Sequence, residues 1–188
     1  RGQRLTEIVR PVCSRVKLAG AEQIPHARIL RAELQRLLGK LRDRGVEECL
    51  VIPLFPHYAM SSYETAVVRV QELQAKLAPQ MKLRVQPPYF EDAGYIRALV
   101  SSAEEYLRQG YDHLLFSFHG IPERHLRKSD PTGKHCLSRT DCCECDSPAI
   151  ATCYRAQCFK TTAAFVKLAG VKNYSVSFQS RLGRDPWL

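Results

Sequence analysis

Short apolar runs alternate with longer amphipathic segments along this chain, and this alternation restricts the fold more than any other feature. Runs with the length and composition of buried strands lie at 49–55, 83–85, 114–118 and 174–178. Apolar residues recur at helical spacing over 30–41, 66–77, 95–107 and 154–169. Strands separated by helices of this length form βαβ units. The sequence therefore predicts an α/β protein with parallel strands and with helices on both faces of each sheet.

Several residues mark where these elements begin and end. Gly45, Gly110 and Gly170 follow the helical segments, as residues at helix C-termini do. Ser61 and Glu64 have the spacing of a capping box before the second helix. Pro87-Pro88 interrupts regular structure and predicts a boundary between domains at residues 1–88 and 89–188.

Composition is that of an ordinary globular protein, with 45% hydrophobic and 25% charged residues among 188. The formal charge of +9 favours an anionic partner such as nucleic acid, acidic lipid headgroups or a small polycarboxylate; a solvated basic surface is the alternative. No stretch approaches the roughly 20 apolar residues that span a membrane. The chain starts at Arg1 and ends at Trp187-Leu188, so we expect it to be an internal part of a longer protein.

Polar residues follow three of the predicted strands, at the edge where parallel sheets bind ligands. They are His119 with Gly120, the segment 179–188, and the segment 56–62. We expect Gly120 to let the backbone turn after the strand. Taken alone, a histidine in an apolar setting such as His119 is more often a hydrogen-bonded structural residue than a catalytic one. No glycine-rich phosphate loop follows any strand, which argues against a nucleotide cofactor.

Three motifs together identify a family. They read Ser117-Phe118-His119-Gly120-Ile121-Pro122, Pro53-Leu54-Phe55-Pro56-His57-Tyr58, and Phe178-Gln179-Ser180-Arg181-Leu182-Gly183-Arg184-Asp185-Pro186-Trp187-Leu188. They resemble, in the same order, motifs of the ferrochelatases, whose version of the second motif reads PLYPQYS. Thr161-Thr162, expected at the start of a helix, also fits this family.

The resemblance implies an enzyme that inserts Fe²⁺ into protoporphyrin IX. It implies two similar doubly wound domains, both incomplete in this chain, with the porphyrin between them. His119 would be the active-site histidine, acting as proton acceptor or as a ligand of the substrate iron, and Tyr58, Ser180 and Arg181 would contact the porphyrin. A histidine suits either role because it titrates near neutral pH and binds ferrous iron.

Two parts of the family pattern are not found in this chain. The family's MRY-type porphyrin-contact segment is expected after residues 16–19, but Gly20-Ala21-Glu22-Gln23 stands there instead. The acidic partner of the histidine is expected beyond Leu188.

Eight cysteines are a high count for a chain of this length. Six of them lie close together: Cys136, Cys142, Cys143, Cys145, Cys153 and Cys158. They belong to an expected insert at 129–153 and to the helix after it. By resemblance to bacterial members with internal cysteine ligands, four of the six would hold a [2Fe–2S] cluster, which needs four thiolates. A structural Zn²⁺ site and unliganded thiols are the alternatives. Cys13 and Cys49 are interpreted as core residues.

Two other functions are alternatives to iron insertion. A related chelatase would act on another tetrapyrrole or another divalent metal such as cobalt. A zinc-dependent nucleic-acid-binding module is disfavoured, because residues 136–158 carry few basic side chains. We expect no nucleic-acid partner. Since porphyrins are lipophilic, we expect a cytoplasmic enzyme with peripheral contact to the inner membrane; the sequence does not predict the oligomeric state.

Overall fold

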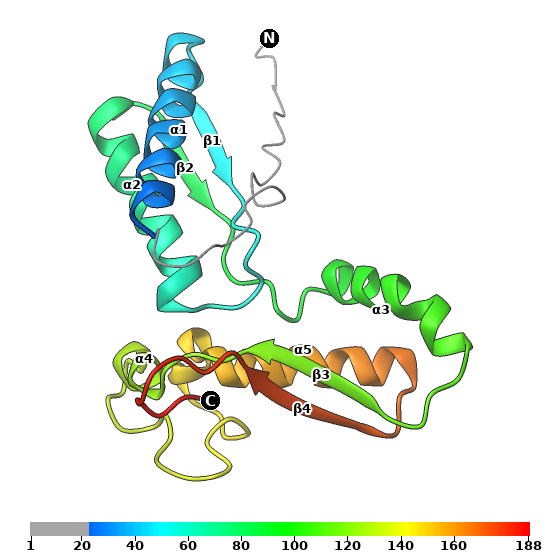
Figure 1. Cartoon of the computed structure of the whole chain (residues 1–188). Coiled ribbons are helices and arrows are strands. Elements are labelled where there is room, and N and C mark those ends of the chain that lie inside the picture. Colours follow the sequence, from blue (N-terminus) through cyan, green and yellow to red (C-terminus); the bar gives the residue numbers. More distant parts are fainter. Residues whose placement is uncertain (1–22) are drawn as a thin grey trace.

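The computed structural model describes residues 23–188, with side chains from residue 32 onward, as an α/β chain with two separate parallel sheets (Figure 1). Cys13 and the segment 16–22 considered above lie outside the described residues. The parallel α/β class is confirmed. The two sheets lie on either side of Pro87-Pro88, whereas the division into two domains at that point stays a prediction.

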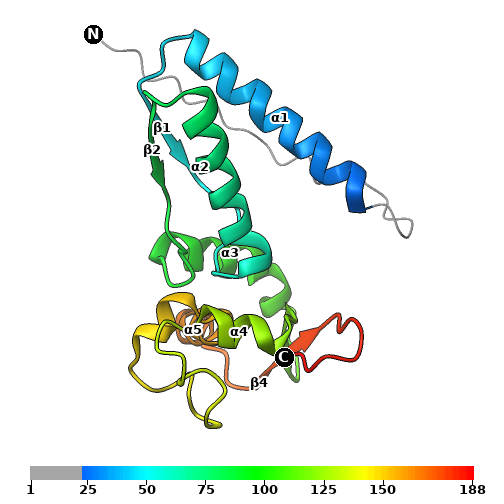
Figure 2. The same ribbon diagram turned by 90° about the vertical axis from the view of Figure 1, so that its left-hand side faces the viewer.

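The first sheet pairs β1 (Glu48–Val51) with β2 (Lys82–Val85) in parallel. Helices α1 (Gln23–Asp43) and α2 (Thr65–Leu77) lie on the same side of it (Figures 1 and 2). Their apolar residues form one core with the inner face of the sheet. Its buried members are Leu38, Leu73, Ala78 and Met81, with Cys49 and Leu83 packed against them.

The predicted strand at 49–55 is shorter than expected. The last ladder hydrogen bond runs from Gln86 N to Val51 O, at 2.8 Å. Pro53 on one side and Pro87-Pro88 on the other have no N–H to continue the ladder. The chain therefore leaves the sheet at Ile52 and forms the loop that carries residues 53–59.

The start of α2 also differs from the prediction. A π-helical turn, η2 (Met60–Glu64), precedes α2, and neither element has a side-chain cap. The capping box of Ser61 and Glu64 is therefore wrong: Ser61 lies inside the π-turn, and Glu64 is directed to Tyr58 instead. Thr65 Oγ1 donates to Met60 O at 2.6 Å, which satisfies one backbone group at this junction.

The second sheet pairs β3 (Leu114–His119) with β4 (Tyr174–Gln179), again in parallel. Helix α5 (Tyr154–Ala169) packs on this sheet through the rings of Phe165 on Phe116 and Phe159 on Phe178. Helix α3 (Ala93–Arg108) packs in turn against α5. Asp92, which was not singled out in the sequence, caps the start of α3 by accepting from Tyr95 N. The predicted end is confirmed at Gly170, whose left-handed φ of 69° ends α5.

Each sheet has helices on one face among residues 23–188, where helices on both faces were expected. Leu50 in β1 and Leu115 in β3 are 53% and 58% exposed on the other faces. Residues of the inner faces, such as Cys49 and Phe116, are partly buried. Because helices cover one face of each sheet, exposed and partly buried side chains alternate along β1 and β3.

Two short helices were not predicted. They are α4 (Glu123–Ser129) and the 3₁₀-helix η3 (Pro148–Thr152). Between them, residues 130–147 form turns without a regular element, as the lack of periodicity predicted. No helix in residues 23–188 has the length and apolar character required to cross a membrane.

Candidate functional site

His119 is the last residue of β3, where it pairs with Gln179 of β4. Its side chain points to the exposed side of the strand, and no hydrogen bond joins it to another described residue. Its main chain is fixed: the hydroxyl of Tyr154 donates to His119 O at 2.9 Å. The site therefore combines a free imidazole with a restrained backbone.

The loop after His119 is joined to the segment 179–188 by backbone hydrogen bonds. Gly120 N donates to Gln179 O at 2.6 Å, Glu123 N to Pro186 O at 2.9 Å, and Leu188 N to Ile121 O at 3.1 Å. An ion pair between Arg124 and Asp185 adds a side-chain contact on the surface. Two motifs that lie about 60 residues apart in sequence thus form one structural unit.

Gly120 is required for close approach rather than for a turn, which corrects the expectation above. Its φ is not in the left-handed region. A Cβ built there would lie 3.0 Å from Gln179 O and 3.3 Å from Leu188 O, both backbone atoms. The ring of Trp187 lies 3.6 Å from the same position. Any larger residue would separate the His119 loop from the segment 179–188.

Ser180 and Arg181 follow β4 directly and are both exposed. Ser180 has a left-handed φ of 73°, a conformation that costs a non-glycine residue about 1–3 kcal/mol and is common at functional sites. Its hydroxyl donates to Gln179 Oε1. No ion pair holds Arg181 within residues 23–188, so its guanidinium is available beside the His119 loop.

Tyr58 lies on the loop after β1 and is half buried. Its backbone N–H donates to Gln157 Oε1 of α5 at 2.6 Å, which ties this loop to the second sheet's helix. Burial, followed by the hydrogen bond to Glu64, raises the pKa of Tyr58 to about 12, so it stays protonated. No contact is recorded between the described side chains of Tyr58 and His119.

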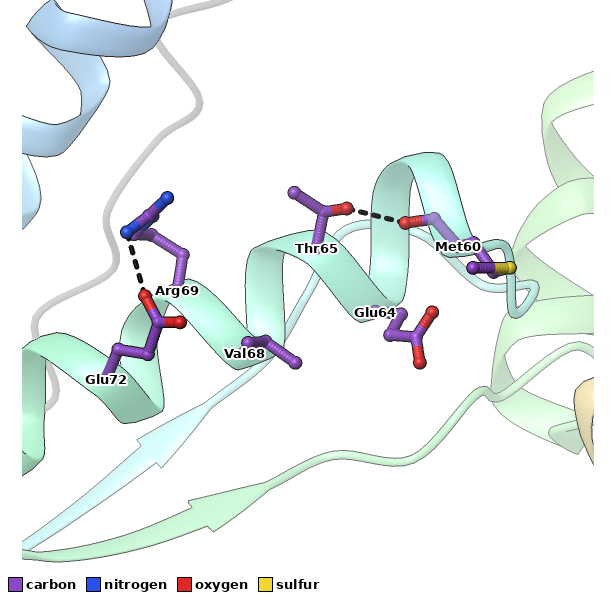
Figure 3. Close-up of a pocket in the computed structure, with 6 residues that line it drawn as sticks. All are labelled: Met60, Glu64, Thr65, Val68, Arg69 and Glu72. Carbon is purple, nitrogen blue, oxygen red and sulfur yellow. Dashed lines mark hydrogen bonds and ion pairs between the residues drawn. The ribbon is translucent and has the colours of Figure 1, made fainter. Parts of the chain in front are cut away.

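A shallow surface groove runs along η2 and α2 near Tyr58. Figure 3 shows its lining residues: Met60, Glu64, Thr65, Val68, Arg69 and Glu72. Arg69 and Glu72 form an exposed ion pair at 2.8 Å. None of the predicted site residues lines this groove. Its lining residue Glu64 is hydrogen-bonded to Tyr58, which links the groove to the candidate site.

His57 is a buried residue to which the sequence assigned no role. Its ring packs edge-on against Phe118, at 5.6 Å between centroids, and against Tyr154 at 5.8 Å. Its Nε2 lies 2.9 Å from Thr161 Oγ1, and that hydroxyl gives its proton to Phe90 O. Nε2 must therefore carry the proton and donate. Burial lowers the pKa of His57 to about 4, which keeps it neutral.

Thr161 and Thr162 lie in the middle of α5, which corrects their expected place at a helix start. Both are buried. Gln157, one turn earlier, is fully buried and donates from Nε2 to Ile150 O and Ala151 O, at 3.0 and 2.9 Å. This helix therefore connects the loop after β1 with the cysteine-containing segment.

The cysteines divide into two groups. Cys153 accepts hydrogen bonds from the thiols of Cys143 and Cys136, and Cys142 lies close enough to interact electrostatically with Cys136 and Cys143. In contrast, the Cys145 thiol is directed to Asp141 O at 3.5 Å, and fully buried Cys158 neighbours Tyr154.

Cys153 caps the N-terminus of α5, accepting from Ala156 N at 3.5 Å. The interaction with the Cys143 thiol lowers the pKa of Cys153 to about 6, helped by the backbone N–H groups of Ala156 and Arg155, although burial opposes them. Cys49, as expected, lies in the core of the first sheet, where it is half buried.

Asp130 organises the start of the cysteine segment. It is buried, and its carboxylate accepts from the backbone N–H groups of Thr132, His135 and Cys136 and from the Thr132 hydroxyl, at 2.7–2.8 Å. Burial alone would raise the pKa of Asp130, but these four donors lower it well below its usual range. An aspartate just before an irregular loop is a local sequence signal for such a turn, because its carboxylate accepts from nearby backbone N–H groups.

The cysteine segment shares one hydrophobic core with the His119 loop. Buried Ile121 packs in the same cluster as Leu126, Cys136, Ala149, Cys153 and Ala156. Within residues 23–188, no three His, Cys, Asp or Glu side chains are arranged to enclose a single metal ion.

Comparison with known proteins places these features in a family. The ferrochelatase family model matches residues 24–188. Proteins named ferrochelatase from Opitutus terrae and Ectopseudomonas mendocina are 51% and 45% identical over 81% and 82% of this chain, which cover 45% and 46% of their own lengths. One from Pseudomonas putida is 43% identical over 93% of the chain and 54% of its own length. The chain thus spans about half the length of the curated relatives it matches.

Proposed function

This chain belongs to the ferrochelatase family, and on that premise we propose that the full-length protein inserts Fe²⁺ into protoporphyrin IX to form protohaem. The observation that carries this proposal is the placement of His119. It is the exposed last residue of β3, and the loop that follows it is joined by hydrogen bonds to the segment 179–188. Ligands of open parallel sheets bind at such ends.

In the proposed reaction His119 acts on the reacting centre. Metal insertion requires that two pyrrole N–H protons leave the ring and that Fe²⁺ reach the ring face. An imidazole can accept a proton or coordinate ferrous iron. The free side chain of His119 on a restrained backbone suits either role.

Tyr58, Ser180 and Arg181 are proposed to contact the porphyrin. The exposed guanidinium of Arg181 suits an anionic propionate, and the Ser180 hydroxyl can donate a hydrogen bond. Tyr58, which remains a neutral phenol, offers an aromatic surface. Protoporphyrin and haem are lipophilic, which supports the further proposal of a cytoplasmic enzyme that docks on the inner membrane.

A substrate panel tests the reaction. Full-length protein is assayed anaerobically with Fe²⁺ and protoporphyrin IX, and separately with Co²⁺ and sirohydrochlorin. We expect protohaem to form with the higher kcat/KM. A preference for cobalt and sirohydrochlorin would assign the protein to a related chelatase instead.

We also propose a [2Fe–2S] cluster held by Cys136, Cys142, Cys143 and Cys153. Supporting this proposal, Cys153 interacts with both Cys136 and Cys143, Cys142 interacts with the same two residues, and a cluster of this type needs four thiolates. The Cys145 thiol is directed to Asp141 O, and Cys158, although it also interacts electrostatically with Cys153, lies beside the Tyr154 hydroxyl. The bound group would supply a one-electron redox centre and would join the loop 136–143 to the start of α5.

Spectroscopy and metal analysis test this assignment. Anaerobically purified full-length protein should absorb between about 400 and 550 nm, bleach with dithionite, and contain two irons, as a [2Fe–2S] centre does. Serine substitutions at the four ligands should abolish the absorbance, whereas Cys145→Ser and the remote control Cys49→Ala should retain it. A colourless protein with one zinc, or with no metal, would contradict the cluster.

A further inference from the structure

Two aromatic side chains from distant parts of the sequence lie beside the end of β3, and one of them contacts the backbone of His119. One is Tyr154, the first residue of α5, whose hydroxyl donates to His119 O at 2.9 Å. The other is His57, on the loop after β1, whose ring contacts both Phe118 and Tyr154. The sequence placed His57 at the ligand-binding edge of the sheet but gave neither residue a role in the site.

The Tyr154 hydroxyl acts on a carbonyl at the end of a strand. Gly120 N continues the pairing with Gln179 O, but the chain then leaves the sheet toward Ile121. Backbone groups at such an end are readily frayed unless something binds them. The Tyr154 hydroxyl binds this carbonyl and restrains the backbone where the strand ends.

The Tyr154 ring is itself held in place from two sides. Phe178 of β4 lies 6.3 Å away and His57 lies 5.8 Å away, both between ring centroids. The His57 contact is edge-on, at 81° between planes, which is a favoured aromatic arrangement. Removing either neighbour would give the phenol freedom to leave the carbonyl.

His57 is fixed in turn by a chain of hydrogen bonds. Its Nε2–H donates to Thr161 Oγ1, and Thr161 donates to Phe90 O at 2.7 Å. Thr161 and Tyr154 lie on the same helix, α5, so this chain fixes His57 relative to the residue it contacts. The contacts therefore connect the loop after β1, through Tyr154, to the backbone of His119.

We propose that Tyr154 and His57 are positioning residues for His119: Tyr154 binds the His119 carbonyl, and His57 holds the Tyr154 ring against it. This inference rests on the proposed role of His119 in metal insertion. Positioning of this kind contributes to the rate because small displacements of a catalytic group are costly. Neither residue needs to touch the porphyrin or the iron.

The first test is Tyr154→Phe in the full-length protein, which removes one hydroxyl and leaves the ring. Loss of one hydrogen bond that positions His119 should lower kcat about fivefold to tenfold and leave the porphyrin KM unchanged. Tyr89→Phe is the matched control, since the Tyr89 hydroxyl also donates to a backbone carbonyl, Pro53 O, at 3.2 Å. It should retain the wild-type kcat.

The second test compares two substitutions of His57. His57→Phe keeps an aromatic ring that can pack edge-on against Tyr154, whereas His57→Leu removes both this ring and the donor to Thr161 Oγ1. His57→Leu should lower kcat as Tyr154→Phe does, and by more than His57→Phe does. A rise in KM with unchanged kcat in Tyr154→Phe would overturn the proposal, because it would indicate a substrate contact.

Amide hydrogen exchange separates this proposal from the proposed function. In Tyr154→Phe, the amides of Gly120 and Leu188, which donate to Gln179 O and Ile121 O, should lose protection, whereas those of residues 114–116 should keep it. If the wild-type protein does not metallate porphyrin, the proposed function fails, and the exchange result alone decides the positioning. Unchanged protection at Gly120 and Leu188 would refute it.

Discussion

At the scale of single residues, the buried carboxylate of Asp130 supports the cysteine segment. Each carboxylate oxygen of Asp130 accepts two hydrogen bonds. In Asp130→Asn one of these oxygens becomes an NH₂ group, which would face two N–H or O–H donors instead of accepting from them. We expect the unfolding free energy at pH 7 to fall by about 2–3 kcal/mol, measured by chemical denaturation. Asp141→Asn, which removes a carboxylate from an exposed pair with Arg139, should leave it nearly unchanged.

The pH dependence of the Asp130 contribution follows from its lowered pKa. The carboxylate is ionised in both folded and unfolded chains above the unfolded value near 3.8, and there its stabilisation is complete. It is lost as the pH falls below that value toward the folded pKa. The difference between wild type and Asp130→Asn should therefore shrink in acid; a difference that is constant down to pH 3 would contradict this account.

His57 gives a second prediction at this scale, with a higher pH window. Its pKa falls from 6.5 to about 4 on folding, so the unfolded chain binds the proton more tightly. Stability from the neutral imidazole is complete above pH 6.5 and is lost as the pH falls toward 4, by up to about 1.4 kcal/mol per pH unit. Denaturation at several pH values should show a steeper loss in wild type than in His57→Gln. Equal slopes would mean that His57 is not buried and neutral.

At the scale of elements, the close contact at Gly120 joins the loop after β3 to the segment after β4. Gly120→Ala would place a Cβ 3.0 Å from Gln179 O, which only a backbone shift can relieve. We expect a loss of about 1–3 kcal/mol in unfolding free energy, as overpacking produces.

Gly39→Ala is the control for this prediction. Gly39 lies inside α1 with no other heavy atom within 4 Å of the added Cβ, so alanine should increase stability by about 0.5–1 kcal/mol. Thermal denaturation that gave both variants the same sign would contradict the close contact at Gly120.

The elements themselves were largely predictable from local patterns. The run 114–118 and the segment 154–169 with Gly170 became β3 and α5 almost at the expected bounds, because apolar length and a helix-ending glycine are local signals. The strand at 49–55 was overextended because the ladder ends where prolines on both chains lack N–H groups, which depends on pairing. Helix α4 was missed because its seven residues are too few to show a period.

At the scale of the whole molecule, Gln157 connects the loop after β1 to the second sheet's helix. Its amide bonds Tyr58 N, Ile150 O and Ala151 O from a fully buried position. Gln157→Leu would leave all three backbone groups without that partner. We expect a loss of about 2–4 kcal/mol in unfolding free energy and faster proteolysis between β2 and α3. Unchanged proteolysis would show that this connection does not hold the two parts together.

These long-range connections are the part of the site that the sequence did not reveal. His119, Ser180 and Arg181 were predictable because they follow strands directly in recognisable motifs. His57 and Gln157 act on partners about 100 residues away in the sequence, and such contacts leave no local pattern. The sequence showed that the cysteines lie close together along the chain, but it did not show that Cys136 and Cys153 interact in the folded protein.

The most direct test of the account is the rate of protohaem formation by the full-length protein carrying His119→Ala. His113→Ala is the matched control, because His113 directly precedes the opposite end of β3 and bonds Ser175 Oγ at 2.9 Å. Under anaerobic conditions with Fe²⁺ and protoporphyrin IX, we expect His119→Ala to lose at least about 100-fold in kcat, as loss of an acid–base group implies, with His113→Ala close to wild type. A His119→Ala protein that forms protohaem at the wild-type rate would contradict the assignment of this site.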